Sequence, residues 1–282
     1  MANDMGVDRT AASPLGIVAG GGELPRRLIE ACRLGGRDVF VLALEGAAEP
    51  QTVADVAHIW CPIGAAARGL SLLRNNRVGE LVFAGSIRRP SLASLRPDWR
   101  AAKFLARVGY RALGDDGLLS AIIAEFEREG FRVVAPEQVL MSGLAPKGVF
   151  GRVVPDPQAM ADIALGERVA RTLGGLDIGQ AVVVQQGLVL GVEAIEGTDE
   201  LLRRCAGLRR EGPGGVLVKV EKPGQEQRVD RPTIGPRTVA LAGQAGLRGI
   251  AVEAGATIVI DRAKVVTDAD RAGVFVVGID RA

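Results

Sequence analysis

Acidic, basic and amide side chains are concentrated between residues 193 and 235. Two acids stand at the end of an expected strand, Asp199 stands at the start of an expected helix, and Lys219 lies on a second strand. The stretch 225–235 then mixes Gln, Glu, Arg and Asp with Pro and Gly, which is poor material for a helix or a strand. Diphosphate chemistry requires carboxylates for Mg²⁺, cations for phosphate oxygens, and hydroxyl or amide groups for the leaving group. We therefore predict a phosphate-handling site here; the alternative is a solvated loop.

Glycines follow two of the expected strands in the first half of the chain. Three glycines follow the strand 15–19, and Gly-Ser follows the strand 81–84. Glycine lets backbone amides approach a phosphate or ribose without a Cβ in the way. The pattern is neither GxGxxG nor a Walker A motif, and a tight turn between strand and helix is the alternative. Because ligands bind beyond the carboxyl ends of parallel strands, we predict that both ends meet at one cleft, where these residues bind substrate: Gly21, Gly22, Gly85 and Ser86.

A third candidate is the segment Gly114-Asp115-Asp116-Gly117. Two adjacent carboxylates before a helix supply an N-cap and a first-turn charge, which need no function. The alternative is a polar or metal contact that faces the same cleft.

Histidine and cysteine chemistry is restricted by the composition. His58 is the one histidine in the sequence, and its apolar surroundings indicate a structural or surface role rather than catalysis. Cys32, Cys61 and Cys205 are far apart and form no CxxC pair, so neither a disulfide framework nor a zinc site is indicated. Acid–base catalysis is therefore assigned to carboxylates, lysines or a metal-bound water.

The bulk composition is that of a soluble protein with a sizeable core, since 48% of the 282 residues are hydrophobic and 24% are charged. A net charge of +2 and the absence of interleaved aromatic and basic residues argue against nucleic acid as a partner. The first residues carry charges instead of the apolar core of a signal peptide, and no run of 18 apolar residues predicts a membrane span. Together with the cysteine usage, these features favour a cytoplasmic protein.

Strands and helices alternate in the first half of the chain. We expect strands at 15–19, 39–43, 81–84 and 131–135, and helices from Pro25 to Gly35, over 70–76 and over 118–130. This alternation predicts an α/β domain with a Rossmann-like open parallel sheet and flanking helices.

The second half mixes hairpins with crossovers, which predicts a mixed α/β domain. We expect a hairpin of strands 181–184 and 188–194, helices over 157–173, 198–208 and 238–245, and strands at 216–220, 257–260 and 274–278. The Gly- and Pro-rich stretch between the halves looks like a linker. The predicted organisation is a flexible tail over 1–14, a nucleotide-binding domain over 15–145, a linker over 146–157 and a C-terminal domain over 158–282.

Basic residues are prominent between residues 88 and 111. Arg100, Lys103, Arg107 and Arg111 share one face of an expected helix. The simplest interpretation is a solvated helix face. The alternative is a helix that rests near an anionic ligand or the anionic headgroups of a membrane.

Long motifs in both halves resemble a known family, the LpxI-type UDP-2,3-diacylglucosamine pyrophosphatases of Gram-negative bacteria. The resemblance covers residues 15–280 and rests on these segments: 17–25, 84–90, 114–116, 177–180, 187–199 and 225–235. The C-terminal motifs are the longer and more specific ones.

The resemblance implies a Mg²⁺-dependent enzyme of lipid A biosynthesis that converts UDP-2,3-diacylglucosamine to UMP and 2,3-diacylglucosamine 1-phosphate (lipid X). Water would attack the phosphorus on the sugar side. The substrate would lie between two domains, and a homodimer would form through the C-terminal domain, which would carry catalysis. Contact with the cytoplasmic face of the inner membrane would then be peripheral.

The aspartate implicated in the family maps to Asp230, either as a Mg²⁺ ligand or as the base that activates water, and Asp199 is the second predicted metal ligand. Lys219 and Arg228 would neutralise phosphate charge. The remaining predicted substrate-binding residues of the second half are Gln180, Glu196, Gly197 and Thr198. Two alternatives stay open: a non-catalytic module that binds a nucleotide or lipid, and an NAD(P)-dependent oxidoreductase, for which Glu45 is the candidate ribose ligand.

Overall fold

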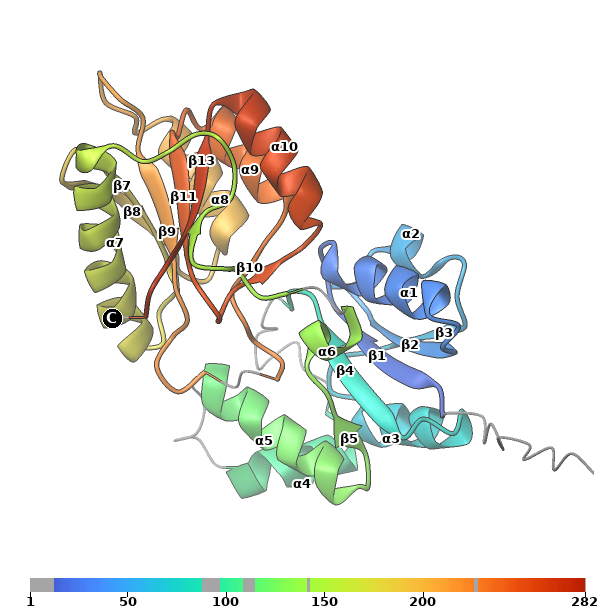
Figure 1. Ribbon diagram of the computed structural model, residues 1–282. Coiled ribbons are helices and arrows are strands. Elements are labelled where there is room, and N and C mark those ends of the chain that lie inside the picture. Colours follow the sequence, from blue (N-terminus) through green and yellow to red (C-terminus); the bar gives the residue numbers. More distant parts are fainter. Residues whose placement is uncertain (1–12, 88–96, 109–114, 141–142, 226–227, 282) are drawn as a thin grey trace, which may run out of the picture. The chain divides into compact units, whose positions relative to one another are not determined.

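The computed structural model describes residues 13–87, 97–108, 115–140, 143–225 and 228–281. The chain forms two compact units, the first made of residues 1–111 and 121–140 and the second of residues 112–120 and 141–282. Each unit combines helices with its own β-sheet (Figure 1). The predicted two-domain α/β fold is confirmed.

The sheet of the first unit has five parallel strands in the order β3-β2-β1-β4-β5. Their bounds are β1 (Leu15–Ala19), β2 (Val39–Leu44), β3 (His58–Cys61), β4 (Glu80–Ala84) and β5 (Arg132–Val133). The chain winds outward from β1 to β3 and then returns to the other side of β1 with β4. The carboxyl ends of β1 and β4 therefore form the switch point at which open parallel sheets bind ligands.

The helices of the first unit are α1 (Leu24–Leu34), α2 (Pro50–Val53), α3 (Ala66–Asn75), α4 (Trp99–Val108), α6 (Pro136–Leu140) and the greater part of α5 (Asp115–Arg128). Pro25 lies in the first turn of α1, as predicted, where its missing N–H is not needed. One turn further on, Leu28 and Ile29 pack with Ile17 and Val41 of the sheet in a single core cluster. Alternate residues of each strand thus face α1 on one side of the sheet.

The second unit is built on a mixed sheet of six strands in the order β6-β13-β11-β9-β7-β8. Their bounds are β6 (Gly148–Val149), β7 (Ala181–Gln185), β8 (Leu188–Val192), β9 (Val216–Lys219), β11 (Gly249–Glu253) and β13 (Phe275–Ile279). The three central strands β9, β11 and β13 are parallel, and β7 and β8 form the predicted antiparallel hairpin. The short strands β10 (Thr233–Ile234) and β12 (Ile258–Val259) pair with each other in a separate parallel ladder.

Helices cover both faces of this sheet (Figure 1). On one face lies α7 (Pro157–Gly175), and on the other lie α8 (Thr198–Ala206), α9 (Pro236–Gln244) and α10 (Arg262–Ala272). The alternation along β9 follows from this arrangement: Val216 and Val218 join the core under α7, and Leu217 joins the core under α8 and α9. Lys219 is two residues after Leu217 and therefore points to the same face of the sheet, so the lysine side chain extends toward α8.

One sequence-based expectation about this unit was wrong, and two of its elements were not predicted. The segment 146–157, expected as a linker, contains β6, which pairs antiparallel with β13, and Phe150 N–H donates to the Val276 carbonyl. This segment is therefore part of the second unit. The central strand β11 and the helix α10 were not predicted. Gly249-Ile-Ala-Val-Glu253 contains Gly, Ala and Glu, which are poor strand formers, and six of the eleven residues of α10 are polar or charged.

The basic helix predicted between residues 88 and 111 is α4, whose charges are partly neutralised. Arg100 pairs with Glu129 at 2.8 Å and Arg107 with Glu125 at 2.9 Å, and Lys103 is exposed. Arg111 lies outside the described residues. These ion pairs favour the solvated-face interpretation. No helix in the described part of the chain is long and apolar enough to cross a membrane.

Candidate active site

One edge of the second sheet brings three of its strand ends together. Ala181, the first residue of β7, pairs with Lys219 at the carboxyl end of β9. The N–H of Glu193, which follows β8, donates to the carbonyl of Ala181 at 2.8 Å. The polar residues that flank these strands therefore lie next to one another although they are far apart in the sequence.

The ammonium group of Lys219 is buried at this edge, with 7% of the residue exposed. Its Nζ donates to Thr198 Oγ1 at 3.0 Å and to the Thr233 carbonyl at 3.1 Å. Thr198 in turn donates its hydroxyl proton to Glu193 Oε1 at 2.6 Å. An ammonium group has three N–H donors, and among the described residues two acceptors are assigned, which leaves one N–H of Lys219 to bind an anion.

Glu193 connects this lysine to a second polar group. Its other oxygen, Oε2, accepts from the backbone N–H of Gln180 at 3.1 Å, and the residue is 6% exposed. The Gln180 side chain accepts from Gln225 Nε2 at 3.4 Å, and the same Nε2 donates to Asp230 Oδ2 at 2.7 Å. Hydrogen bonds thus link Lys219 to the Asp230 carboxylate through intermediate residues, with Gln180 joined to Glu193 by its backbone and to Gln225 by its side chain.

A second lysine lies beside Asp230. Lys222 Nζ pairs with Asp177 Oδ1 at 2.7 Å and lies 4.0 Å from Asp230 Oδ2. The Asp230 side chain keeps 36% of its surface exposed, whereas the side chain of Lys222 is 9% exposed. The same end of the sheet therefore carries a partly exposed carboxylate next to one buried cation, Lys222, and a second buried cation, Lys219, linked to it through hydrogen-bonded residues. Such groups can bind and polarise an anionic group such as a phosphate.

A divalent cation at this edge would have few protein ligands. Within the described ranges, no three His, Cys, Asp or Glu side chains come together as a metal cage. Asp199, the second predicted ligand, instead forms an ion pair with Arg237 at 2.8 Å. Mg²⁺ often binds through one or two carboxylates together with substrate phosphates and waters. The accessible Asp230 carboxylate fits that mode, in which the substrate supplies most of the ligands.

The first unit has its own polar edge at the switch point. Gly21 and Ser86 form an antiparallel bridge, in which Gly21 N–H donates to the Ser86 carbonyl at 2.8 Å and Ser86 N–H donates to the Gly21 carbonyl at 2.9 Å. The two glycine-rich strand ends thus meet, as expected. Their approach needs glycine, since a Cβ on Gly85 would lie 2.4 Å from the Gly21 carbonyl oxygen. These two amides are committed to the bridge, so a ligand would use other groups here, such as the exposed Ser86 hydroxyl.

Comparison with known proteins gives the family. Residues 14–144 match the model of the LpxI N-terminal domain, and residues 146–277 match the model of the LpxI C-terminal domain. The chain belongs to the LpxI family. It is 44% identical, over an alignment of 277 residues that covers 94% of this chain and 97% of the relative, to UDP-2,3-diacylglucosamine pyrophosphatase LpxI of Caulobacter vibrioides (strain ATCC 19089 / CIP 103742 / CB 15). The resemblance inferred from the motifs is confirmed.

Four predicted site residues of this LpxI family member belong to this series of hydrogen-bonded groups. Lys219 and Asp230 are its two ends, and Thr198 and Gln180 lie between them. Glu196 lies apart from that chain, since its carboxylate pairs with Arg204 at 2.7 Å and accepts from the Ala194 N–H. Gly197 is the N-cap of α8, with a φ of 80° that favours glycine.

Two other predicted regions are described less fully. Arg228 is half-buried, two residues before Asp230. Gly114 lies outside the described residues, and of Asp115 and Asp116 only the backbone, at the start of α5, is described.

Three residues of the site were missed as functional residues: Asp177, Lys222 and Gln225. Each lies in or next to a motif that was noticed, but none carries a local signal that shows its partner. Asp177 did offer one signal. It lies just after Gly174-Gly175, where a helix was expected to end, and the residue that follows a helix end is commonly glycine rather than aspartate.

The histidine and the three cysteines have structural surroundings. His58 Nδ1 lies 2.8 Å from the Val56 carbonyl, and its half-buried ring packs edge-on to Trp60. All three cysteines are buried, and burial raises the pKa of each thiol above its ordinary value. None of them is therefore poised as a thiolate nucleophile.

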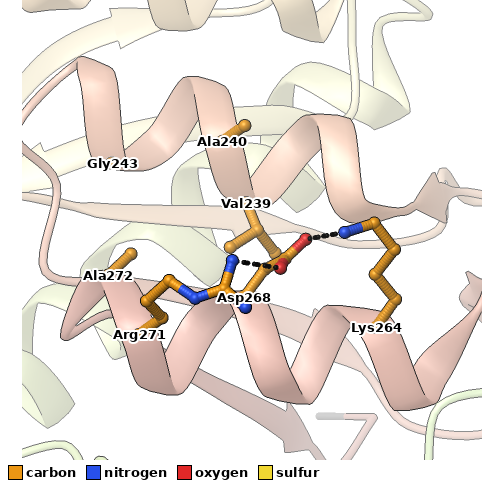
Figure 2. Close-up of a pocket in the computed structure, with 7 residues that line it drawn as sticks. All are labelled: Val239, Ala240, Gly243, Lys264, Asp268, Arg271 and Ala272. Atoms are coloured by element: carbon orange, nitrogen blue, oxygen red, sulfur yellow. Dashed lines mark hydrogen bonds and ion pairs between the residues drawn. The ribbon is translucent and has the colours of Figure 1, made fainter.

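A separate hollow lies between α9 and α10 (Figure 2). It is lined by Val239, Ala240, Gly243, Lys264, Asp268, Arg271 and Ala272. Asp268 pairs with Lys264 at 2.8 Å and with Arg271 at 3.3 Å across this surface. Because Asp268 pairs with both cations of the hollow and no predicted site residue lines it, we assign it no part in the chemistry.

Proposed function

We propose that the chain hydrolyses the diphosphate of UDP-2,3-diacylglucosamine to UMP and 2,3-diacylglucosamine 1-phosphate, a step of lipid A biosynthesis. The extensive similarity to a relative named for that activity supports the proposal. The observation that carries it is the convergence of Asp230, Gln180, Thr198 and Lys219 on one hydrogen-bonded chain at one sheet edge. These residues are the ones that the family motifs and the requirements of diphosphate chemistry had singled out.

In the proposed reaction, the oxygen of a water molecule bonds to the phosphorus on the sugar side. The bond from that phosphorus to the bridging oxygen breaks, and UMP leaves with the bridging oxygen. The proton lost by water goes to a base, for which Asp230 is the accessible carboxylate of the site. The remaining N–H of Lys219 would stabilise charge that develops on the phosphate oxygens.

We also propose Mg²⁺ as the cofactor. In the alternative in which Asp230 is a metal ligand and not the base, Asp230 would hold the ion together with oxygens of the substrate. When bound, Mg²⁺ would neutralise phosphate charge and polarise the reacting phosphoryl group. Lys222 Nζ lies 4.0 Å from Asp230 Oδ2, and 36% of the Asp230 side chain is exposed. Chelation with EDTA should abolish turnover, and added Mg²⁺ should restore it.

The decisive experiment is an incubation of purified protein with UDP-2,3-diacylglucosamine and Mg²⁺ in ¹⁸O-labelled water, followed by chromatography and mass spectrometry. We expect UMP release, with the label in 2,3-diacylglucosamine 1-phosphate. Asp230→Ala should reduce the rate at least about 1,000-fold if the carboxylate acts in the transition state. Asp280→Ala removes an exposed aspartate of the same unit and is the control. No UMP from the wild type would refute the proposed activity, and full activity of Asp230→Ala would refute the role of Asp230.

The same incubation separates the alternatives. A non-catalytic module would bind UDP-2,3-diacylglucosamine without releasing UMP, and an oxidoreductase would require NAD(P) and leave the diphosphate intact. We retain a cytoplasmic location, peripheral membrane contact and a homodimer as parts of the proposal that rest on the sequence and the family resemblance. Sedimentation equilibrium tests the dimer.

A further inference from the structure

Asp177 has an unusual backbone conformation at the end of α7. Its φ is 55°, in the left-handed region that is strained for residues other than glycine and, to a smaller degree, asparagine and aspartate. Asp177 N–H donates to the Gly174 carbonyl at 2.9 Å, and Ile178 N–H donates to the Leu173 carbonyl at 3.1 Å. This pair of hydrogen bonds closes many helices, and the position that Asp177 occupies usually carries glycine. An aspartate there indicates a use for its carboxylate.

The carboxylate of Asp177 binds a buried ammonium group. Lys222 is 8% exposed, and its Nζ lies 2.7 Å from Asp177 Oδ1. The aliphatic part of Lys222 packs directly against α7, since a Cβ on Gly174 would lie 3.2 Å from Lys222 Cγ. A buried ammonium group needs a partner of opposite charge. The helix end therefore fixes Lys222 both by packing and by charge.

Lys222 acts on Asp230 in two ways. Its Nζ lies 4.0 Å from Asp230 Oδ2, at the outer limit of an ion pair. Its backbone N–H donates to Gln225 Oε1 at 3.0 Å, which turns Gln225 Nε2 toward Asp230 Oδ2 at 2.7 Å. A chain of fixed contacts thus leads from the end of α7 through Lys222 to the accessible carboxylate.

We propose that Asp177 and Lys222 are positioning residues that orient the Asp230 carboxylate for the diphosphate hydrolysis proposed above, on which this inference rests. Asp177 holds the ammonium group of Lys222 at 2.7 Å, which keeps it 4.0 Å from Asp230 Oδ2 and prevents a short ion pair with Asp230. Without Asp177, the ammonium group is released to pair directly with Asp230 and to compete for the oxygens that act on substrate.

The test is steady-state kinetics of UMP release by Asp177→Asn, Asp177→Gly, Lys222→Met and the Asp177→Asn/Lys222→Met double variant. Asparagine and glycine both accept the left-handed backbone, so the turn is kept while the charge is removed. We expect kcat to fall roughly 10- to 100-fold in each single variant with KM changed less than about threefold, as for other supporting partners of site groups. The double variant should lose less than the product of the two single effects, because both remove the same link.

Matched controls come from the exposed pair in Figure 2, through Asp268→Asn and Lys264→Met, which should keep kcat within about twofold. Thermal unfolding of every variant separates positioning from folding: a lowered Tm with unchanged kcat would mean a purely structural pair and would overturn the inference. Unchanged kcat in both Asp177 variants would also overturn it while leaving the proposed function intact. Absence of UMP from the wild type would overturn both.

Discussion

Both units place functional candidates where parallel strands end, but they build these edges from different parts of the chain. In the first unit, Gly21 and Ser86 join the ends of β1 and β4 backbone to backbone, at a distance that only glycine allows at position 85. In the second unit, the edge consists of buried side chains, including Lys219, Glu193 and Gln225. The first edge depends on the absence of side-chain volume, whereas the second depends on matched charge and hydrogen bonding, because buried polar groups are costly unless paired.

The largest expected effect of a single change beyond Asp230 is at the charged edge. Lys219→Met removes a buried cation that contacts Thr198 and the Thr233 carbonyl. We expect the rate of UMP release to fall about 100- to 1,000-fold, as when a preorganised donor to a developing anion is lost. Lys147→Met, which removes an exposed lysine of the same unit, is the control. A loss smaller than threefold at Lys219, with the fold intact by circular dichroism, would contradict the role assigned to this edge.

The second effect tests the glycine edge through stability. Gly85→Ala should lower the free energy of unfolding of the first unit by about 2–4 kcal/mol, because φ is +90° and the new Cβ meets the Gly21 carbonyl oxygen. Both tryptophans, Trp60 and Trp99, belong to the first unit. Urea unfolding followed by tryptophan fluorescence therefore reports on that unit.

The control for this change is Gly36→Ala. Gly36 also has a positive φ, of +66°, but a Cβ there meets nothing within 4 Å. It should cost only the backbone strain, about 1 kcal/mol. Equal losses at both glycines would mean that strain alone, and not the close approach of the two strand ends, limits the first edge.

The smallest effect concerns Glu196, a predicted site residue that the structure ties to its own segment. Burial alone would raise its pKa, but hydrogen bonds from backbone N–H groups and the Arg204 guanidinium outweigh burial and hold the pKa below the ordinary 4.5. A lowered folded-state pKa stabilises the fold above the ordinary value and loses that contribution as the pH falls through the folded pKa. Glu196→Gln should therefore cost less than about 1 kcal/mol at neutral pH, and the difference from wild type should shrink below pH 4.5.

Thermal unfolding at about pH 7 and about pH 4 measures this difference. Glu200→Gln on α8 removes an exposed carboxylate paired with Arg203 and is the matched control. The same loss of stability at both pH values would show that the charge of Glu196 is not what stabilises the segment.

Local sequence features predicted much of the fold. The hairpin turn is an example: Gln186 and Gly187 both have positive φ, of 51° and 76°, and the polar pair between two apolar runs indicated a turn there. The helix α8 begins at Thr198, as its glycine and acidic first turn suggested. In contrast, β6 is two residues long and exists only because β13 lies beside it, so no local pattern could reveal it.

The sequence by itself determined the α/β class, the family and the segments in which the chemistry lies. Strand–helix alternation, glycine turns and long motifs each depend only on residues that are neighbours in the sequence. Only the tertiary structure decided which of those residues act together. Asp177 and Lys222 are 45 positions apart and meet through the packing of α7 on β9. Likewise, Glu193 reaches Gln180 through the register of β7 and β8. Burial and pairing depend on such contacts between distant segments, so the site followed from how the sheet orders its strands.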